Sequence, residues 1–194
     1  MLVTIFGGGG FLGRYVAQEL LSRGMRVRVA EREPTHALRV KPLGTLGQTQ
    51  LVHADVRDGS SVARAVAGAD AVVNLVAVLK GDLDGINHKG AANVAQAAAQ
   101  AGVGTLVHVS AIGSDAASKS AYGRSKGQGE EAVRAAFPGA TLIRPSILFG
   151  REDQFTNRFA NLIRMAPVLP VIAGGTKFQP VYVVDVARAI ATAV

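Results

Sequence analysis

The chain has 194 residues, 48% of them hydrophobic, which suffices for one well-buried domain and is too short for two ordinary ones. It contains no cysteine, so disulfides, thiol catalysis and cysteine metal sites are excluded. The formal net charge of +7 favours an anionic ligand or partner, or simply a solvated basic face. Nucleic acid is not expected as that partner, because only 5% of the residues are aromatic and the arginines are scattered through the periodic segments.

A strand-like apolar pattern begins at Leu2, which leaves no room for a signal or transit peptide. The longest apolar run, Ala71 to Leu79, is interrupted by Asn74 and falls short of the ~18 residues that cross a bilayer. We therefore expect a cytoplasmic protein, typical of bacteria, without a transmembrane segment. Peripheral association with the inner face of the cytoplasmic membrane stays open because of the basic surface.

Short β-branched runs alternate with longer amphipathic segments, as they do in a parallel sheet covered by helices. The predicted strands are, in chain order, Val3–Phe6, Val27–Glu31, Gln50–His53, Ala71–Leu75, Thr105–Ser110, Thr141–Arg144 and Val181–Val184. The predicted helices are Phe11–Ser22, Ser61–Val66, Ile86–Ala101, Tyr122–Ala136, Phe155–Met165 and Val186–Ala193, the last capped by Asp185. No linker is visible, so the fold class is α/β: one Rossmann domain over residues 1–194, with a doubly wound parallel sheet.

A run of glycines follows the first predicted strand and opens the first predicted helix. Gly7, Gly10 and Gly13 have the spacing that a pyrophosphate needs. Glycine permits a tight turn and a close backbone approach, and the helix N-terminus offers free N–H groups and a positive dipole end. We therefore predict a phosphate-binding loop made of Gly7, Gly9, Gly10, Phe11, Leu12 and Gly13.

Two oppositely charged residues end the second predicted strand. Glu31 would accept hydrogen bonds from an adenosine ribose, whereas Arg32 would bind a 2′-phosphate bidentately. A carboxylate beside a phosphate is repulsive, so Glu31 must turn away if NADP(H) is the ligand. Because Arg14 and Arg39 could accompany Arg32, NADP(H) is the preferred cofactor and NAD(H) the alternative. An exposed ion pair between Glu31 and Arg32 is a third interpretation.

Several short motifs beyond the glycine loop occur in an order typical of one large family. They are Asp55 within residues 53–58, Asn74 to Ala77, His108 to Ser110, Tyr122 with Lys126, and Arg144 to Ser146. This order resembles the short-chain dehydrogenase/reductase superfamily in its extended or atypical branch, of the NAD-dependent epimerase/dehydratase type. Residues 150–153 (Gly-Arg-Glu-Asp) and 179–186 are similar to a narrower group, the NADPH-binding accessory subunits of respiratory complex I and their bacterial relatives.

The resemblance implies a role for each matching position. Asp55 and Val56 would contact the adenine, and Val76 and Ala77 would line the path of the second ribose. The residues implied at the nicotinamide end are Ser110, Tyr122, Lys126, Pro145, Ser146 and Ile147. The family also has a C-terminal portion over the substrate, which is short or missing in this chain.

Tyr122 and Lys126 are four residues apart and would share one face of a helix. An ammonium beside a phenol stabilises the phenolate, which would lower the pKa of Tyr122 towards that of a general acid/base. With Ser110 they form the set of catalytic candidates. Ala111 argues against catalysis, because extended-branch enzymes commonly have a second hydroxyl there to polarise the substrate carbonyl.

Two functions remain in competition. The first is a binding role, in which NADP(H) is a structural or sensing ligand and the partner is respiratory complex I or another protein. The second is an active NAD(P)-dependent reductase, epimerase or dehydratase that acts on a carbonyl or sugar-nucleotide substrate. Partial exposure of Tyr182, Val184 and Ile190 is expected and favours a homodimer. No metal site is expected, since the spacing of His36, His53, His88 and His108 is not that of metal ligands.

Overall fold

The computed structural model describes residues 1–165 and 174–194. Within these residues a parallel six-stranded sheet has the order β3-β2-β1-β4-β5-β6, which confirms the predicted doubly wound α/β fold. Its strands are β1 (Leu2–Phe6), β2 (Arg26–Glu31), β3 (Thr49–His53), β4 (Ala71–Asn74), β5 (Thr105–Val109) and β6 (Thr141–Ile143). From β1 the chain adds β2 and β3 on one side of the sheet, and then β4, β5 and β6 on the other. The strand order therefore reverses between the parallel neighbours β1 and β4, and the carboxyl ends of these two strands form the switch point where such sheets bind ligands.

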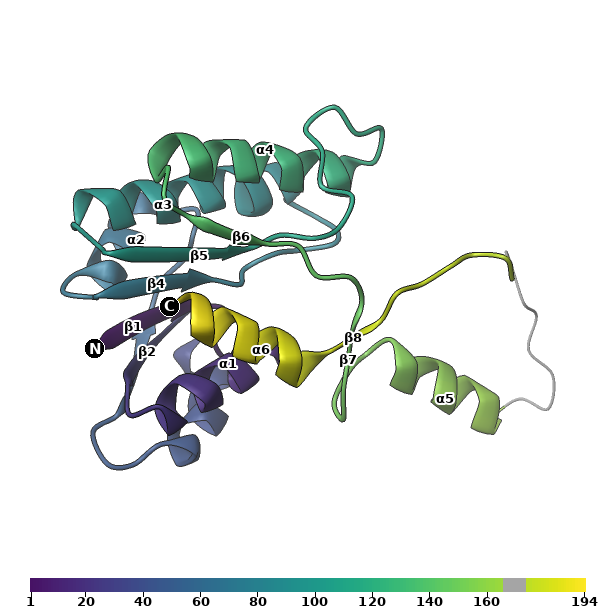
Figure 1. The fold of residues 1–194 in the computed structure, drawn as a ribbon, viewed down its shortest axis with the longest axis horizontal. Coiled ribbons are helices and arrows are strands. Elements are labelled where there is room, and N and C mark those ends of the chain that lie inside the picture. The colour runs from purple at the N-terminus through teal and green to yellow at the C-terminus, as the bar shows by residue number, and fades with distance from the viewer. Residues whose placement is uncertain (166–173) are drawn as a thin grey trace.

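Helices cover both faces of the sheet (Figure 1). One face packs against α1 (Phe11–Ser22) and α6 (Val183–Ala193), and the other against α2 (Gly59–Val66), α3 (Gly90–Gln100) and α4 (Ala121–Ala136). Alternate residues of β1 feed the two cores, with Val3 and Ile5 in the first and Phe6 in the second. The sheet is therefore buried on both sides, as the near-continuous apolar strands require.

Two short helical segments were not predicted as such. The 3₁₀ segment η1 (Pro34–Leu43) follows β2, and the π-helical segment η2 (Asp84–Lys89) precedes α3, where one continuous helix was expected from Ile86. In η2 the Asn87 side chain hydrogen-bonds both the N–H and the C=O of Val78, each at 2.9 Å. This tie to the loop after β4 accompanies the widened turn.

The chain after β6 leaves the main sheet. It forms β7 (Leu148–Phe149), α5 (Thr156–Met165) and β8 (Val181–Tyr182), and β7 pairs in parallel with β8. Figure 1 shows α5 standing apart from the sheet and its covering helices.

The prediction for the last strand and helix was partly wrong. The strand ends at Tyr182 and the helix already begins at Val183, with Tyr182 rather than Asp185 as its N-cap residue. Tyr182 is 43% exposed and Val184 is partly buried, but Ile190 is fully buried against α1 and the sheet. The amphipathic period of α6 therefore turns Ile190 inward, and the expected partial exposure holds for Tyr182 and Val184 but not for Ile190.

Candidate functional site

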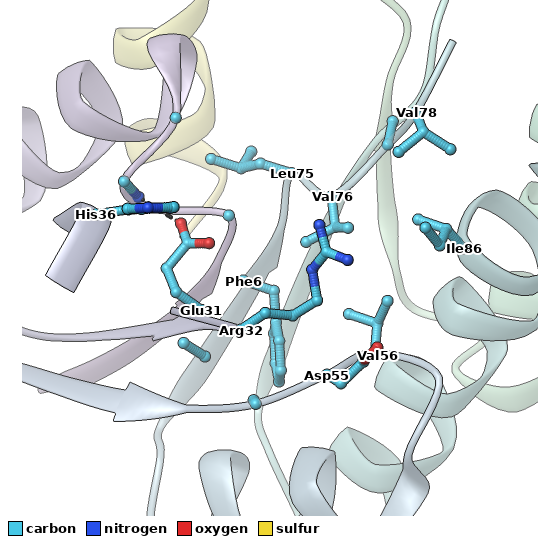
Figure 2. A pocket seen from close by; sticks show the side chains of 16 residues that line it. Phe6, Glu31, Arg32, His36, Asp55, Val56, Leu75, Val76, Val78 and Ile86 are labelled. Atoms are coloured by element: carbon cyan, nitrogen blue, oxygen red, sulfur yellow. Dashed lines mark hydrogen bonds between the residues drawn. The ribbon is translucent and has the colours of Figure 1, made fainter. Parts of the chain in front are cut away.

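A cavity of about 370 Å³ lies at the switch point, over the carboxyl ends of β1, β2 and β4 (Figure 2). Its lining comes from five segments: the end of β1 with the β1–α1 loop, the end of β2 with the start of η1, the residues after β3, the residues after β4, and η2. The lining residues are Phe6, Gly7, Gly9, Gly10, Ala30, Glu31, Arg32, His36, Ala54, Asp55, Val56, Leu75, Val76, Ala77, Val78 and Ile86. An apolar pocket with a few polar groups at this position is the common form of a cofactor site.

The glycine loop is shaped to bring backbone close to a ligand. Gly7 has a φ of +81°, a conformation that glycine adopts without strain. A Cβ on Gly13 would lie 2.6 Å from the Cα of Gly8, so only glycine allows this crossing of loop and helix. Gly10 is the N-cap of α1 and offers no side-chain cap, which leaves the first N–H groups of the helix available to an anion. These features fit a dinucleotide pyrophosphate.

Glu31 and Arg32 point in different directions (Figure 2). The Oε1 atom of Glu31 accepts a hydrogen bond of 2.7 Å from the N–H of Gly9, which ties the carboxylate to the glycine loop. Arg32 is exposed at the cavity, and no ion pair joins it to Glu31 among the described residues. Arg14 and Arg39, which were expected to accompany Arg32, do not line this cavity and instead line a second one.

Asp55 and Val56 follow β3 and line the cavity, as the resemblance implied for the adenine end. The carboxylate of Asp55 is held by Arg57, with an Nη2–Oδ2 distance of 2.6 Å. Hydrogen bonding from this guanidinium lowers the pKa of Asp55 to about 2. Asp55 is thus an anion at neutral pH. Its position is set by Arg57, which the sequence analysis did not identify as part of the site.

Of the residues predicted for the second ribose and the nicotinamide, only some line the cavity. Val76 and Ala77 line the cavity, whereas Pro145, Ser146 and Ile147 do not, and neither do the three catalytic candidates. The side chain of Lys126 is fully buried, and its Nζ donates to the carbonyl oxygen of Val109 at 3.0 Å. Burial lowers the pKa of Lys126 to about 8.

Tyr122 does not show the expected activation. Burial raises the pKa of Tyr122, the opposite of the lowering that a neighbouring ammonium would give. Spacing did place Tyr122 and Lys126 on one helix, α4, but it could not show that the lysine amine turns to a backbone carbonyl.

Ser110 has a hydroxyl neighbour that sequence analysis missed. Its Oγ lies 2.9 Å from the Oγ of Ser114, which also donates to the carbonyl oxygen of Ala111 at 2.7 Å. The hydroxyl of Ser114 therefore lies beside Ser110 and is itself bonded to the backbone of Ala111. A loop serine gives no signal in a single sequence, so this pair could not have been found there.

A buried polar network beneath the candidate residues was also missed. Asn74 at the end of β4 bonds His108 on β5 (Nδ2–Nδ1, 3.2 Å), and Asn87 bonds the hydroxyl of Ser125 at 3.1 Å. Burial has the largest single effect on Glu130 and would raise its pKa. The hydrogen bonds from Arg144 and Ser110, together with the charges of Arg144 and Arg134, outweigh burial and lower the pKa. The polar residues inside apolar strands, Asn74 and His108, were the available sequence signal.

The described residues contain no cluster of three or more potential metal ligands. None of the described helices is long and apolar enough to cross a membrane.

The chain matches the model of the NAD dependent epimerase/dehydratase family over residues 3–194, and it belongs to that family. The predicted resemblance is thereby confirmed, and with it a dinucleotide-binding Rossmann domain.

The curated relatives include a respiratory subunit. NADH dehydrogenase (ubiquinone) 1 alpha subcomplex subunit 9, mitochondrial, of Arabidopsis thaliana is 38% identical over 203 residues, covering 100% of this chain and 50% of the plant protein. A Caulobacter vibrioides protein named ceramide reductase is 33% identical over 191 residues, covering 96% of this chain and 58% of the bacterial protein. The chain thus spans about half the length of the curated relatives it matches.

Solved structures share the fold. The Bordetella bronchiseptica enzyme WbmH in complex with NAD+ matches with a TM-score of 0.79 and 23% identity, covering 99% of this chain and 71% of WbmH. At this identity the likeness establishes the architecture, with its sheet order and crossovers, and nothing finer.

Proposed function

We propose that the protein binds NADP(H) in preference to NAD(H) and uses it as a structural or sensing ligand. The observation that carries this proposal is the switch-point cavity, with a glycine cradle on one side and the exposed guanidinium of Arg32 at its mouth. A guanidinium pairs bidentately with a phosphate, and NADP(H), unlike NAD(H), has a 2′-phosphate on its adenosine ribose. Glu31 is bonded to Gly9, so its carboxylate is turned from the Arg32 side.

A binding role is favoured over chemistry by the nicotinamide-end residues. Lys126 is buried with its amine on the Val109 carbonyl, and Tyr122 has a raised pKa. Ala111 offers no hydroxyl, and the hydroxyl of Ser110 is engaged with Ser114. A general acid/base needs both a reachable proton and a pKa near the working pH. Tyr122 lacks the second, because its pKa is raised, and Lys126 lacks the first, because its amine is buried although its pKa is about 8.

The proposed partner is the respiratory NADH dehydrogenase, which the protein would bind at the inner face of the cytoplasmic membrane. The support is the relative from Arabidopsis thaliana, which is named as a subunit of that complex and is 38% identical over the whole of this chain. The net charge of +7 agrees with a location beside an anionic membrane or an acidic subunit.

Cofactor titrations test the preference. NADPH should bind more tightly than NADH, and Arg32→Ala should remove most of the difference, because a charge-assisted contact in a partly open site contributes ~1.5–3 kcal/mol. Arg134→Ala is the matched control, since it removes an exposed arginine from α4 on the other face of the sheet. Equal affinities for the two cofactors in the native protein would overturn the preference.

The alternative function is an active reductase, epimerase or dehydratase, favoured by the Tyr122–Lys126 spacing on α4 and by the Caulobacter relative named ceramide reductase. Native protein with NADPH is assayed against a panel of carbonyl and sugar-nucleotide substrates, alongside Tyr122→Phe. We expect no turnover above background from either protein. Steady turnover that Tyr122→Phe abolishes without weakening cofactor binding would establish the enzyme instead.

A further inference from the structure

A second cavity, of about 230 Å³, lies beside α1 and away from the dinucleotide site. It is lined by basic side chains from three elements: Arg14 from α1, Arg39 from η1, and Arg151 from the loop between β7 and α5. These residues are far apart in the sequence, so the fold brings the three positive charges together around one hollow.

Within the part of the chain that the structure describes, the three guanidinium groups have no partner of opposite charge. Among residues 1–165 and 174–194, none of them takes part in a side-chain hydrogen bond or an ion pair, whereas Arg57, Arg144 and other surface arginines do. The acidic group in the lining is Glu152, and its carboxylate accepts a hydrogen bond of 2.5 Å from the hydroxyl of Tyr15. The hydrogen bond to Glu152 raises the pKa of Tyr15, so the tyrosine stays a donor at neutral pH.

The loop that places Arg151 is anchored on both sides. A Cβ on Gly150 would lie 2.7 Å from a methyl carbon of Val183, so Gly150 is pressed against α6. Asp153 is buried, and its Oδ1 accepts from the N–H of Phe155 at 2.9 Å and of Thr156 at 2.6 Å. The second acid of the loop is therefore used to cap α5 and leaves Arg151 unneutralised.

We propose that Arg14, Arg39 and Arg151 form an anion subsite for a phosphate group, distinct from the dinucleotide pocket. Guanidinium groups bind phosphate oxygens bidentately. Three guanidinium groups can bind more oxygens than the two of a carboxylate, which favours phosphate over carboxylate as the ligand. The cavity is smaller than those that enclose whole drug-sized ligands, which start at about 300 Å³, so a phosphate would enter while the rest of its molecule stays outside. The group belongs either to a free phosphorylated compound or to a lipid headgroup.

Calorimetric titration of the full chain with inorganic phosphate tests the subsite. Saturable binding is expected, weakened about tenfold or more by Arg39→Gln and by Arg151→Gln, and weakened by added salt. Arg134→Gln, which removes the same charge from α4, should leave binding unchanged. Arg32→Ala should also retain phosphate binding, so loss of the NADPH preference and loss of this subsite are separate results.

Sedimentation with vesicles distinguishes the two sources. Binding to phosphatidylglycerol vesicles but not to phosphatidylcholine vesicles, lost in Arg39→Gln and Arg151→Gln, assigns the phosphate to a lipid headgroup. Binding of inorganic phosphate without vesicle binding assigns it to a free compound. The subsite is disproved if phosphate shows no saturable binding, or if Arg134→Gln weakens it as much as the two cavity variants do.

Discussion

His108 lies on β5 with only 1% of its surface exposed, and its Nε2 atom has no hydrogen-bond partner among the residues that the structure describes. Burial, with a smaller contribution from the charge of Lys126, lowers the pKa of His108 to about 3. The ring is therefore neutral in the folded protein at any ordinary pH. In the unfolded chain it takes up a proton below pH 6.5, its ordinary pKa.

The pH dependence of stability follows from this difference. Since the folded pKa is the lower one, the unfolded state binds more protons as the pH falls from 6.5 towards 3, and stability is lost across that window. At pH 5 the loss is about 2 kcal/mol by linkage. His108→Gln should flatten the acid side of the stability profile in urea unfolding measured from pH 7.5 to pH 5.

The control for this experiment is His53→Gln, an equal substitution at an exposed histidine on β3. It should follow the native acid profile. If His108→Gln retains the native slope as well, the acid sensitivity comes from other groups.

Sequence patterns identified individual residues better than the contacts between them. The glycine spacing and the position of Glu31 and Arg32 at the end of β2 predicted part of the cavity lining. Of the predicted loop, Gly7, Gly9 and Gly10 line the cavity, whereas Phe11, Leu12 and Gly13 do not. The same patterns did not predict that Glu31 binds the Gly9 N–H or that Arg14 and Arg39 face another cavity. Such choices depend on side-chain rotamers and on neighbours that are distant in the chain, and no local period encodes them.

At the scale of elements, the turn from β1 into α1 makes the sharpest demand on the sequence. The position of Gly13 in the first turn of α1 is in contact with the backbone of Gly7 and Gly8. Gly13→Ala should therefore separate loop from helix, destabilise the protein and abolish dinucleotide binding. Native protein at a hundredfold excess of NADPH over its dissociation constant should gain about 2.7 kcal/mol, seen as a higher melting temperature. Gly13→Ala should show no such gain.

Gly59→Ala is the matched control, because no atom lies within 4 Å of the added Cβ at the start of α2. It should fold, bind NADPH and keep the thermal shift. A Gly13→Ala protein that also keeps the shift would show that the close approach is not required for binding.

The six strands of the main sheet were predicted closely, whereas β7 and the irregular helices were not predicted. The ends of β2 and β3 fall within a residue of their predicted bounds because apolar β-branched runs between turn residues are a strong local signal. η1 contains Pro42 within its run and has little apolar period, so no helix was expected there. α4 contains Gly123, Gly127 and Gly129, and a Cβ on Gly129 would collide with the carbonyl of Asn87, so its packing rather than its propensity explains the glycines.

At the scale of the whole molecule, the sheet order and the two covering layers follow from the alternation of strands and helices and from right-handed crossovers. The location of the exposed apolar surface could not be predicted from the sequence in the same way. It was expected at Tyr182, Val184 and Ile190, but Ile190 on α6 is buried against α1, whereas α5 has no buried residue. A helix period alone does not say whether its apolar stripe has a partner.

The apolar stripe of α5 should make the chain self-associate. None of its residues is buried, and Phe159, Leu162 and Ile163 are 51%, 42% and 64% exposed at positions that share one helix face. Large contiguous apolar patches are rare on soluble monomers and tend to find a partner. Sedimentation velocity should show a dimer or larger species in the native chain, shifted towards monomer by Ile163→Glu. Asn161→Glu adds the same charge to the polar face of α5 and should leave the distribution of species unchanged. Association through this stripe would be contradicted by a native chain that sediments as a monomer, or by equal shifts in both variants.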